Sequence, residues 1–200
     1  MGSDKKQQGE KGMMSIFIDG WETNLKFSAA HFIPFHNKCR RLHGHDYAID
    51  IRIDGELRKG MVADFVVVKK EIRKLLEDID HRLILPAEGK DMEQKKEGSQ
   101  YIIKYEGMTM SIPEEFVYLC DVEYSSSEEL SRFFAREMVK RVHFEGNVKE
   151  IQVSVYEGPG ATPFVLIPFG PHSTATLFVN ALNPPLAAAD GVTYADPVSA

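Results

Sequence analysis

The chain has 200 residues, a length that suits one domain with its own hydrophobic core. Its formal net charge of −6 weakly opposes non-specific nucleic-acid binding, and no apolar stretch is long enough for a membrane-spanning helix. The polar opening, residues 1–13, lacks the apolar centre of a signal peptide and is interpreted as a disordered lead or expression remnant. Two cysteines are too few for a disulfide framework, so we expect a cytoplasmic protein without nucleic-acid or membrane partners.

Two strands are predicted early in the chain, because apolar residues alternate with polar ones. The first covers about residues 25–33 and has His31 on its apolar side. The second covers about residues 43–53, has His43 and His45 on one side, and ends in an Asp-Gly turn. A polar, basic loop joins the two strands.

Two amphipathic helices are expected later in the chain. Asp64 can cap the first, which runs to about Asp78 with apolar residues at spacings of three and four. Ser125 or Ser126 can cap the second, since an acidic residue follows each serine three positions later. This second helix runs to about Val142.

Two further strands are expected over residues 151–157 and 164–167. The order strand, strand, helix, helix, strand, strand predicts an α+β fold, with a mainly antiparallel four-stranded sheet and two helices on one face. We therefore expect a single domain over residues 14–171.

Two segments fall outside this pattern. Residues 86–123 form an insertion between the helices, with a small hairpin predicted around Glu106-Gly107. Residues 172–200 form a C-terminal tail of unknown role, in which the sequence ATLFV is a candidate edge strand.

Three histidines form the strongest candidate site. His43 and His45 share one side of a strand, and a hairpin would bring His31 beside them. Three imidazoles with an open fourth position are typical of a catalytic zinc centre. The alternative is three ordinary histidines held by hydrogen bonds, but their matching strand parity favours a metal.

Cys39 lies between the two histidine strands and has two interpretations. As a fourth metal ligand it would make the site structural. As a thiolate beside a cation it could act as a base or nucleophile. Spacing alone does not choose between them.

Two acidic positions are further candidates. If the Asp80 carboxylate meets the adjacent His81, it would orient the imidazole for acid–base chemistry; a histidine that only ends a helix is an equal alternative. Glu157 continues the apolar side of its strand, where a carboxylate needs a partner or marks a site. It could accept paired N–H groups from an amino-pyrimidinone ring, or simply reach water at the strand end.

Together these motifs resemble the 6-pyruvoyltetrahydropterin synthase / 6-carboxytetrahydropterin synthase family. The matching segments are FSAAH, CRRLHGH, VADF, DIDHRLI, SSSEEL and VSVYEG, in the family's order over about residues 24–158. The resemblance implies the tunnelling fold (T-fold), in which subunits pair antiparallel sheets into a β-barrel. It also implies a homo-oligomer, usually a hexamer built as a dimer of trimers, with sites at subunit contacts.

The resemblance implies three groups of site residues. The ligands of Zn2+ are His31, His43 and His45. The catalytic groups are Cys39, Asp80 and His81. The substrate-binding residues are Glu157, Ser126 and Glu128. The SSSE segment departs from the family's Pro-Thr-x-Glu, since it keeps a hydroxyl but loses the proline.

The gap of three residues between Cys39 and His43 is similar to that of the 6-carboxytetrahydropterin synthase branch. This branch implies a zinc-dependent lyase that converts 7,8-dihydroneopterin triphosphate to 6-carboxy-5,6,7,8-tetrahydropterin, in 7-deazaguanine (queuosine and archaeosine) biosynthesis. Arg40, Arg41 or Lys26 could meet the phosphates. The alternatives are a 6-pyruvoyltetrahydropterin synthase or another pterin-side-chain enzyme of the same fold, and a zinc- or pterin-binding module without catalysis.

Overall fold

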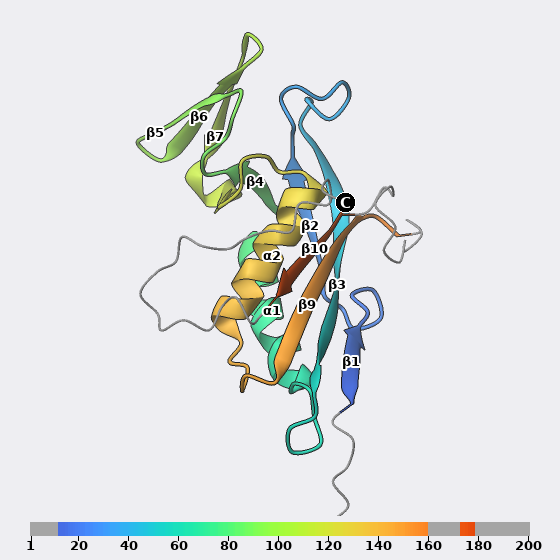
Figure 1. Cartoon of the computed structure of the whole chain (residues 1–200). Helices are drawn as coiled ribbons and strands as arrows, with labels where there is room; N and C mark the ends of the chain where they lie inside the picture. The colour runs from blue at the N-terminus through green and yellow to red at the C-terminus, as the bar shows by residue number, and fades with distance from the viewer. Residues whose placement is uncertain (1–11, 160–172, 179–200) are drawn as a thin grey trace, which may run out of the picture.

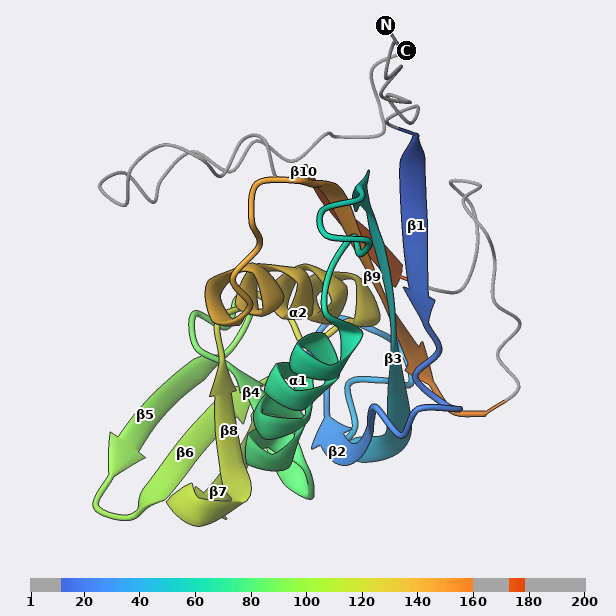
Figure 2. The ribbon, with the colours of Figure 1, turned by 90° about the horizontal axis from the view of Figure 1, so that it is seen from below.

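The structure, a computed structural model, describes residues 12–159 and 173–178, the latter as backbone only. Its main sheet has the strand order β10-β9-β3-β2-β4-β8, and β1 also pairs with β3. The strands are β1 (Met13–Ile18), β2 (Lys26–His31), β3 (His43–Glu56), β4 (Arg82–Pro86), β8 (Val117–Cys120), β9 (Val148–Glu157) and β10 (Ser173–Phe178). The helices α1 (Phe65–Ile79) and α2 (Ser127–Arg141) cover one face of this sheet (Figures 1 and 2).

β3 is the central strand of the sheet. Its first half pairs antiparallel with β2, its second half with β1, and β9 runs antiparallel along its other side. Ile49, Ile51 and Ile53 are fully buried in the main core. Branched side chains suit this pleated, buried surface, so the alternation seen in the sequence becomes the floor of the core.

Both helices begin where their caps predict. The Asp64 carboxylate accepts hydrogen bonds from the first backbone N–H groups of α1, and the Ser126 hydroxyl accepts one from Glu129 N–H in α2. Each helix buries an apolar stripe against the sheet. None of the described helices is long and apolar enough to cross a membrane.

The α+β architecture is confirmed, and the sheet is larger than its four predicted strands. β9 contains the predicted strand 151–157, and the edge strand expected in the tail is present as β10, antiparallel to β9. The predicted strand 164–167 lies outside the described residues, as does the lead of residues 1–13 apart from its last two. The strands β1, β4 and β8 were not predicted; β4 and β8 join the sheet in parallel pairings beyond β2.

The insertion forms a second, three-stranded antiparallel sheet. Its strands are β5 (Glu93–Glu97), β6 (Gln100–Tyr105) and β7 (Met108–Pro113), followed by the short helix η1 (Glu114–Phe116). The predicted hairpin is confirmed, with Glu106 and Gly107 at positive φ in its turn. A separate core joins this sheet to the main one through Phe32, Leu83, Leu85, Ile103, Tyr105 and Val117. The inserted sheet lies at the same end of the molecule as the loop between β2 and β3 (Figure 1).

Candidate metal centre and active site

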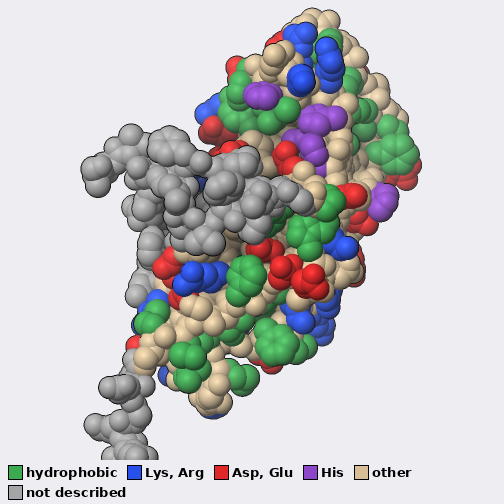
Figure 3. Space-filling view, turned by 90° about the vertical axis from the view of Figure 1, so that its right-hand side faces the viewer, with side chains coloured by type: hydrophobic (Ala, Val, Ile, Leu, Met, Phe, Trp, Pro, Cys, Tyr) green, Lys and Arg blue, Asp and Glu red, His purple; other side chains and the backbone are tan. Residues whose placement is uncertain are grey.

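The hairpin of β2 and β3 brings the three predicted histidines together. His31 lies directly opposite His43 in the strand register, and His45 follows on the same face. Their ligand atoms all lie within 4.8 Å of one another. His31 is buried, whereas the other two rings are half-buried. Histidine side chains gather toward one end of the molecule, with Lys and Arg side chains beyond them (Figure 3).

Backbone carbonyls fix the orientation of two of the rings. Nδ1 of His31 lies 2.7 Å from the carbonyl oxygen of Ser125, and Nδ1 of His43 lies 2.7 Å from that of Arg41. A carbonyl oxygen can only accept, so each Nδ1 carries the hydrogen and each neutral ring presents a lone pair at Nε2. These two Nε2 atoms face each other at 3.2 Å.

This arrangement fits a metal ion. Facing lone pairs repel unless a proton or a cation lies between them, and burial in the site lowers the pKa of His31, which disfavours an added proton. A tetrahedral zinc ion with Zn–N bonds of about 2.0–2.1 Å requires ligand nitrogens about 3.3 Å apart. The Nε2 separation between His31 and His43 is close to that value. The donor set is therefore suited to a zinc-type cation.

Glu157 lies beside the histidines, as its strand parity predicts. One carboxylate oxygen lies 3.7 Å from Nε2 of His45, and the other accepts a hydrogen bond of 2.5 Å from the hydroxyl of Ser127. Glu157 is exposed, so its carboxylate is accessible to a ligand. Ser126, one position earlier, uses its hydroxyl to cap α2, and the exposed Glu128 lies in the first turn. The substrate-binding roles of Glu157, Ser126 and Glu128 stay predictions.

Asp80 and His81 make the contact that the sequence left open. Oδ2 of Asp80 lies 2.8 Å from Nδ1 of His81. Ser28 of β2 secures the pair from both sides: its N–H donates to Asp80 Oδ1 at 2.8 Å, and its carbonyl accepts from His81 N–H at 2.7 Å. His81 adopts a φ of 60°, in the left-handed region, and its side chain is 80% exposed. The carboxylate thus orients the ring, while the catalytic role stays a prediction.

An open cavity of about 570 Å³ is lined by His45 of the histidine cluster and by His81 of this acid–base pair. Its polar lining includes His45, Asp46 and His81 from the main sheet and its loops. Its apolar lining includes Ile112 and Phe116 from the insertion. The insertion therefore contributes to the wall of the candidate active site.

Cys39 lies in the loop that follows β2 and is half-buried. Among the described residues the cluster of converging ligand atoms holds the three histidines without this cysteine. Burial raises the pKa of Tyr47, and the charges of Glu157 and Cys39 add to that rise. The choice between a catalytic cysteine and a fourth metal ligand therefore stays a prediction.

Three features of the candidate site were missed by the sequence analysis. The Ser125 carbonyl that orients His31 is a backbone atom, which no residue type reveals. Ser127, which contacts Glu157, is one of three consecutive serines, and only the start of α2 distinguishes them. Tyr47 shares the strand parity of the histidines, which could have identified it; its buried hydroxyl has no hydrogen-bond partner among the described residues.

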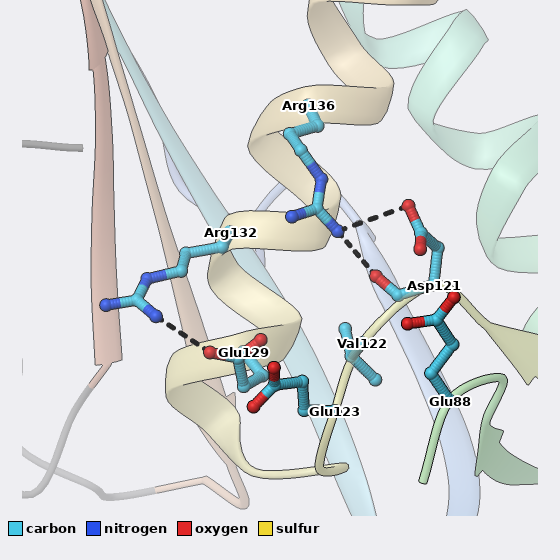
Figure 4. A pocket seen from close by; sticks show the side chains of 7 residues that line it. All are labelled: Glu88, Asp121, Val122, Glu123, Glu129, Arg132 and Arg136. Carbon is cyan, nitrogen blue, oxygen red and sulfur yellow. Dashed lines mark hydrogen bonds and ion pairs between the residues drawn. The ribbon is translucent and has the colours of Figure 1, made fainter. Parts of the chain in front are cut away.

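A second cavity, of about 310 Å³, lies beside α2 and contains none of the predicted site residues (Figure 4). Acidic and basic side chains line it and pair with one another. Arg132 lies 2.7 Å from Glu129, and Arg136 lies 3.5 Å from Asp121. Such exposed ion pairs are typical of a solvated surface.

The comparisons with known proteins identify the family. A model of the family described as 6-pyruvoyl tetrahydropterin synthase matches residues 22–165. The chain belongs to this family. A relative from Methanocaldococcus jannaschii, named putative 6-carboxy-5,6,7,8-tetrahydropterin synthase, is 34% identical over 152 residues, which cover 74% of this chain and 93% of that protein.

Two other family comparisons bear on fold and reaction. The crystal structure of 6-pyruvoyl tetrahydropterin synthase from Plasmodium vivax superposes with a TM-score of 0.72 at 22% identity, covering 84% of this chain and 99% of that one. This likeness shows the shared T-fold. A Pyrococcus furiosus protein named dihydroneopterin monophosphate aldolase is 36% identical over 56 residues, 28% of this chain and 48% of that protein.

Proposed function

We propose that the protein is a zinc-dependent 6-carboxy-5,6,7,8-tetrahydropterin synthase acting on 7,8-dihydroneopterin triphosphate. The observation that carries this proposal is the pair of facing Nε2 atoms in His31 and His43, with His45 beside them, which suits zinc with an open fourth position. The name of the Methanocaldococcus jannaschii relative supports the choice of product. The proposed setting is 7-deazaguanine biosynthesis in the cytoplasm, in keeping with two free cysteines.

The residues of this chain divide the chemical work between them. Zinc held by the three imidazoles would supply Lewis-acid polarisation of the substrate's side-chain oxygens. Cys39 Sγ exchanges a proton with a side-chain carbon of the substrate. His81 is the complementary acid–base group, and Nε2 is its working atom because Asp80 engages Nδ1. Glu157 accepts N–H groups of the pterin ring and so holds the reacting carbons in place.

We also propose that the chain works as a homo-oligomer, a hexamer built as a dimer of trimers. The cavity beside His81 is open in the single chain, and that side chain is 80% exposed. Exposed apolar residues cluster on β1 and at the start of α1, namely Met13, Met14, Phe17, Phe65 and Val66. Large exposed apolar patches mark interaction surfaces, and closing a T-fold barrel would cover such residues.

A product assay tests the proposed reaction. The purified protein is incubated with 7,8-dihydroneopterin triphosphate, and the products are identified by mass spectrometry. We expect 6-carboxy-5,6,7,8-tetrahydropterin together with acetaldehyde. A 6-pyruvoyl product, or tight pterin binding without any turnover, would refute the assigned reaction.

Metal analysis tests the proposed cofactor separately. We expect about one zinc ion per chain in the parent protein, as for a mononuclear site, and loss of that zinc in His43→Ala. His143→Ala is the matched control, since this exposed histidine lies outside the cluster. Full zinc retention in His43→Ala would remove the ligand assignment.

A second candidate function is side-chain cleavage that yields 6-hydroxymethyl-dihydropterin. The Pyrococcus furiosus relative named dihydroneopterin monophosphate aldolase favours it, over the part of the chain that it matches. Parallel assays with the monophosphate and the triphosphate of 7,8-dihydroneopterin separate the two functions. Preferential turnover of the monophosphate to the hydroxymethyl product would select this alternative.

A further inference from the structure

Residues of the inserted sheet form hydrogen bonds with the loop that carries Cys39. The hydroxyl of Tyr105, at the end of β6, donates a 2.7 Å hydrogen bond to the backbone carbonyl of Arg40. Glu106, the next residue, accepts a 2.9 Å hydrogen bond from the Arg40 guanidinium. Two consecutive residues of the insertion thus hold both the backbone and the side chain of the residue that follows Cys39.

Tyr105 is itself fixed against the metal-site hairpin. Its ring stacks on Phe32 at a centroid distance of 4.7 Å and an interplanar angle of 11°. Phe32 directly follows His31, and both aromatic side chains are buried. A stacked, buried ring has little freedom to move. The Tyr105 hydroxyl therefore holds the Arg40 carbonyl at a set position relative to the histidine cluster.

The hydrogen bond from Tyr105 falls within the Cys39 loop, residues 32–42, which joins β2 to β3. Three successive carbonyls of this loop accept hydrogen bonds. The Cys39 carbonyl accepts from Ile33 N–H at 2.7 Å, and the Arg41 carbonyl receives the Nδ1–H of His43 at 2.7 Å. Both of these partners belong to the histidine hairpin, whereas the partner of the Arg40 carbonyl comes from the insertion.

We infer that Tyr105 and Glu106 are positioning residues, which hold the Cys39 loop in its working arrangement. The insertion is then a component of the active site, in addition to lending Ile112 and Phe116 to the cavity wall. The same contact pairs the guanidinium of Arg40, one of the residues predicted to meet the phosphates, with Glu106. The catalytic meaning of this inference rests on the proposed function, because that proposal gives Cys39 its role.

The alkylation rate of Cys39 measures the order of the loop without requiring turnover. The full chain, zinc-free and zinc-loaded, is treated with iodoacetamide at fixed pH, and modification is located by peptide mass spectrometry. Cys120 is an internal reference, since it is fully buried. Loss of a hydrogen bond worth about 1 kcal/mol corresponds to a change of about fivefold. We therefore expect Tyr105→Phe to raise the alkylation rate of Cys39 about fivefold.

Two further variants make the comparison specific. Glu106→Gln removes an exposed ion pair, for which we expect a smaller rise of about twofold. Tyr101→Phe is the matched control, because it makes the same chemical change on the same strand and side of β6, where Tyr101 packs on the same small core. We expect this control to alkylate at the parent rate.

Kinetics completes the test. In Tyr105→Phe we expect kcat to fall about fivefold, since one hydrogen bond is lost, with KM and zinc content unchanged. Equal alkylation of Cys39 in the parent, Tyr101→Phe and Tyr105→Phe would overturn the inference. Faster alkylation in Tyr105→Phe than in Tyr101→Phe supports the inference even where the parent turns over no pterin. Absence of turnover would refute the proposed function but not the loop contact.

Discussion

At the scale of single residues, Cys39 allows the proposed chemistry to be tested apart from the proposed metal binding. Among the described residues, the converging ligand atoms come from the three histidines and not from Cys39. We expect Cys39→Ala to keep about one zinc per chain and to lose turnover by at least about a hundredfold, as removal of an acid–base group does. Metal analysis and the pterin assay measure the two effects. Loss of zinc in this variant would instead make the cysteine a ligand.

Glu157 allows a separate test of substrate recognition. Glu157→Gln keeps the size of the side chain but removes the charge that would accept two ring N–H groups. Since a hydrogen bond to a charged group contributes about 1.5–3 kcal/mol, pterin affinity should fall at least about tenfold by calorimetric titration. Glu150→Gln, on the same strand, is the control. Equal affinity in both variants would argue against the anchor role.

Asp50 is a buried carboxyl on β3 that links stability to pH. It accepts hydrogen bonds from Gly20 N–H at 2.8 Å and the Tyr156 hydroxyl at 2.9 Å, yet burial, the largest effect, raises its pKa. A carboxyl with a raised pKa in the folded protein binds its proton more tightly there than in the unfolded chain. The stability that this proton contributes is therefore lost as the pH rises through the folded-state pKa.

Asp50→Asn stays neutral and avoids this loss. We expect the free energy of unfolding of the variant, relative to the parent, to increase as the pH rises above about 4, the usual pKa of an aspartate. Urea denaturation at several pH values measures the difference. A difference that stays constant as the pH rises would show that Asp50 does not titrate as its burial requires.

At the scale of elements, the stability of helix α1 depends on the capping contact of Asp64 at its N-terminus. Asp64 accepts hydrogen bonds from Val66 N–H at 2.9 Å and Val67 N–H at 3.3 Å. We expect Asp64→Ala to lower the free energy of unfolding by about 1 kcal/mol. The control is Asp78→Ala near the other end of α1, where an acidic side chain opposes the helix dipole and its removal should not destabilise. Equal effects in urea denaturation would exclude a capping contribution.

The elements that the sequence predicted are those with a clear period. β2, β3, β9 and both helices show alternation or spacings of three and four, because one side of each faces a single core. β4 is buried over most of its five residues, so its apolar run carries no alternation to read. In the insertion only the Glu106-Gly107 turn was recognised, since a glycine between two apolar segments marks a hairpin in the sequence.

The candidate site was predictable to the same extent. Strand parity placed His31, His43 and His45 together. It also placed Glu157 beside them, at the end of the series of apolar residues on one side of its strand. Contacts through backbone atoms or between distant loops were not predictable. The hydrogen bonds from His31 to the Ser125 carbonyl and from Tyr105 to the Arg40 carbonyl depend on how whole elements pack, which no local sequence pattern encodes.

At the scale of the whole molecule, the proposed zinc should stabilise the folded state. A ligand that binds only the folded chain adds about 2.7 kcal/mol at a hundred times its Kd. We therefore expect chelation to lower the Tm of the parent and added zinc to restore it. The Tm of His43→Ala should respond to neither treatment. A parent Tm that is independent of zinc would contradict binding at this centre.

The histidine hairpin also has a consequence for how the molecule is made. All three imidazoles lie within one short segment, residues 31–45, whereas the Ser125 carbonyl that orients His31 lies 94 residues further along the chain. During synthesis the ribosome thus completes the set of donors early and the group that orients His31 late. If the proposed zinc binds at this hairpin, we expect tight affinity only when the chain before α2 reaches it. Its appearance during refolding therefore times that docking event.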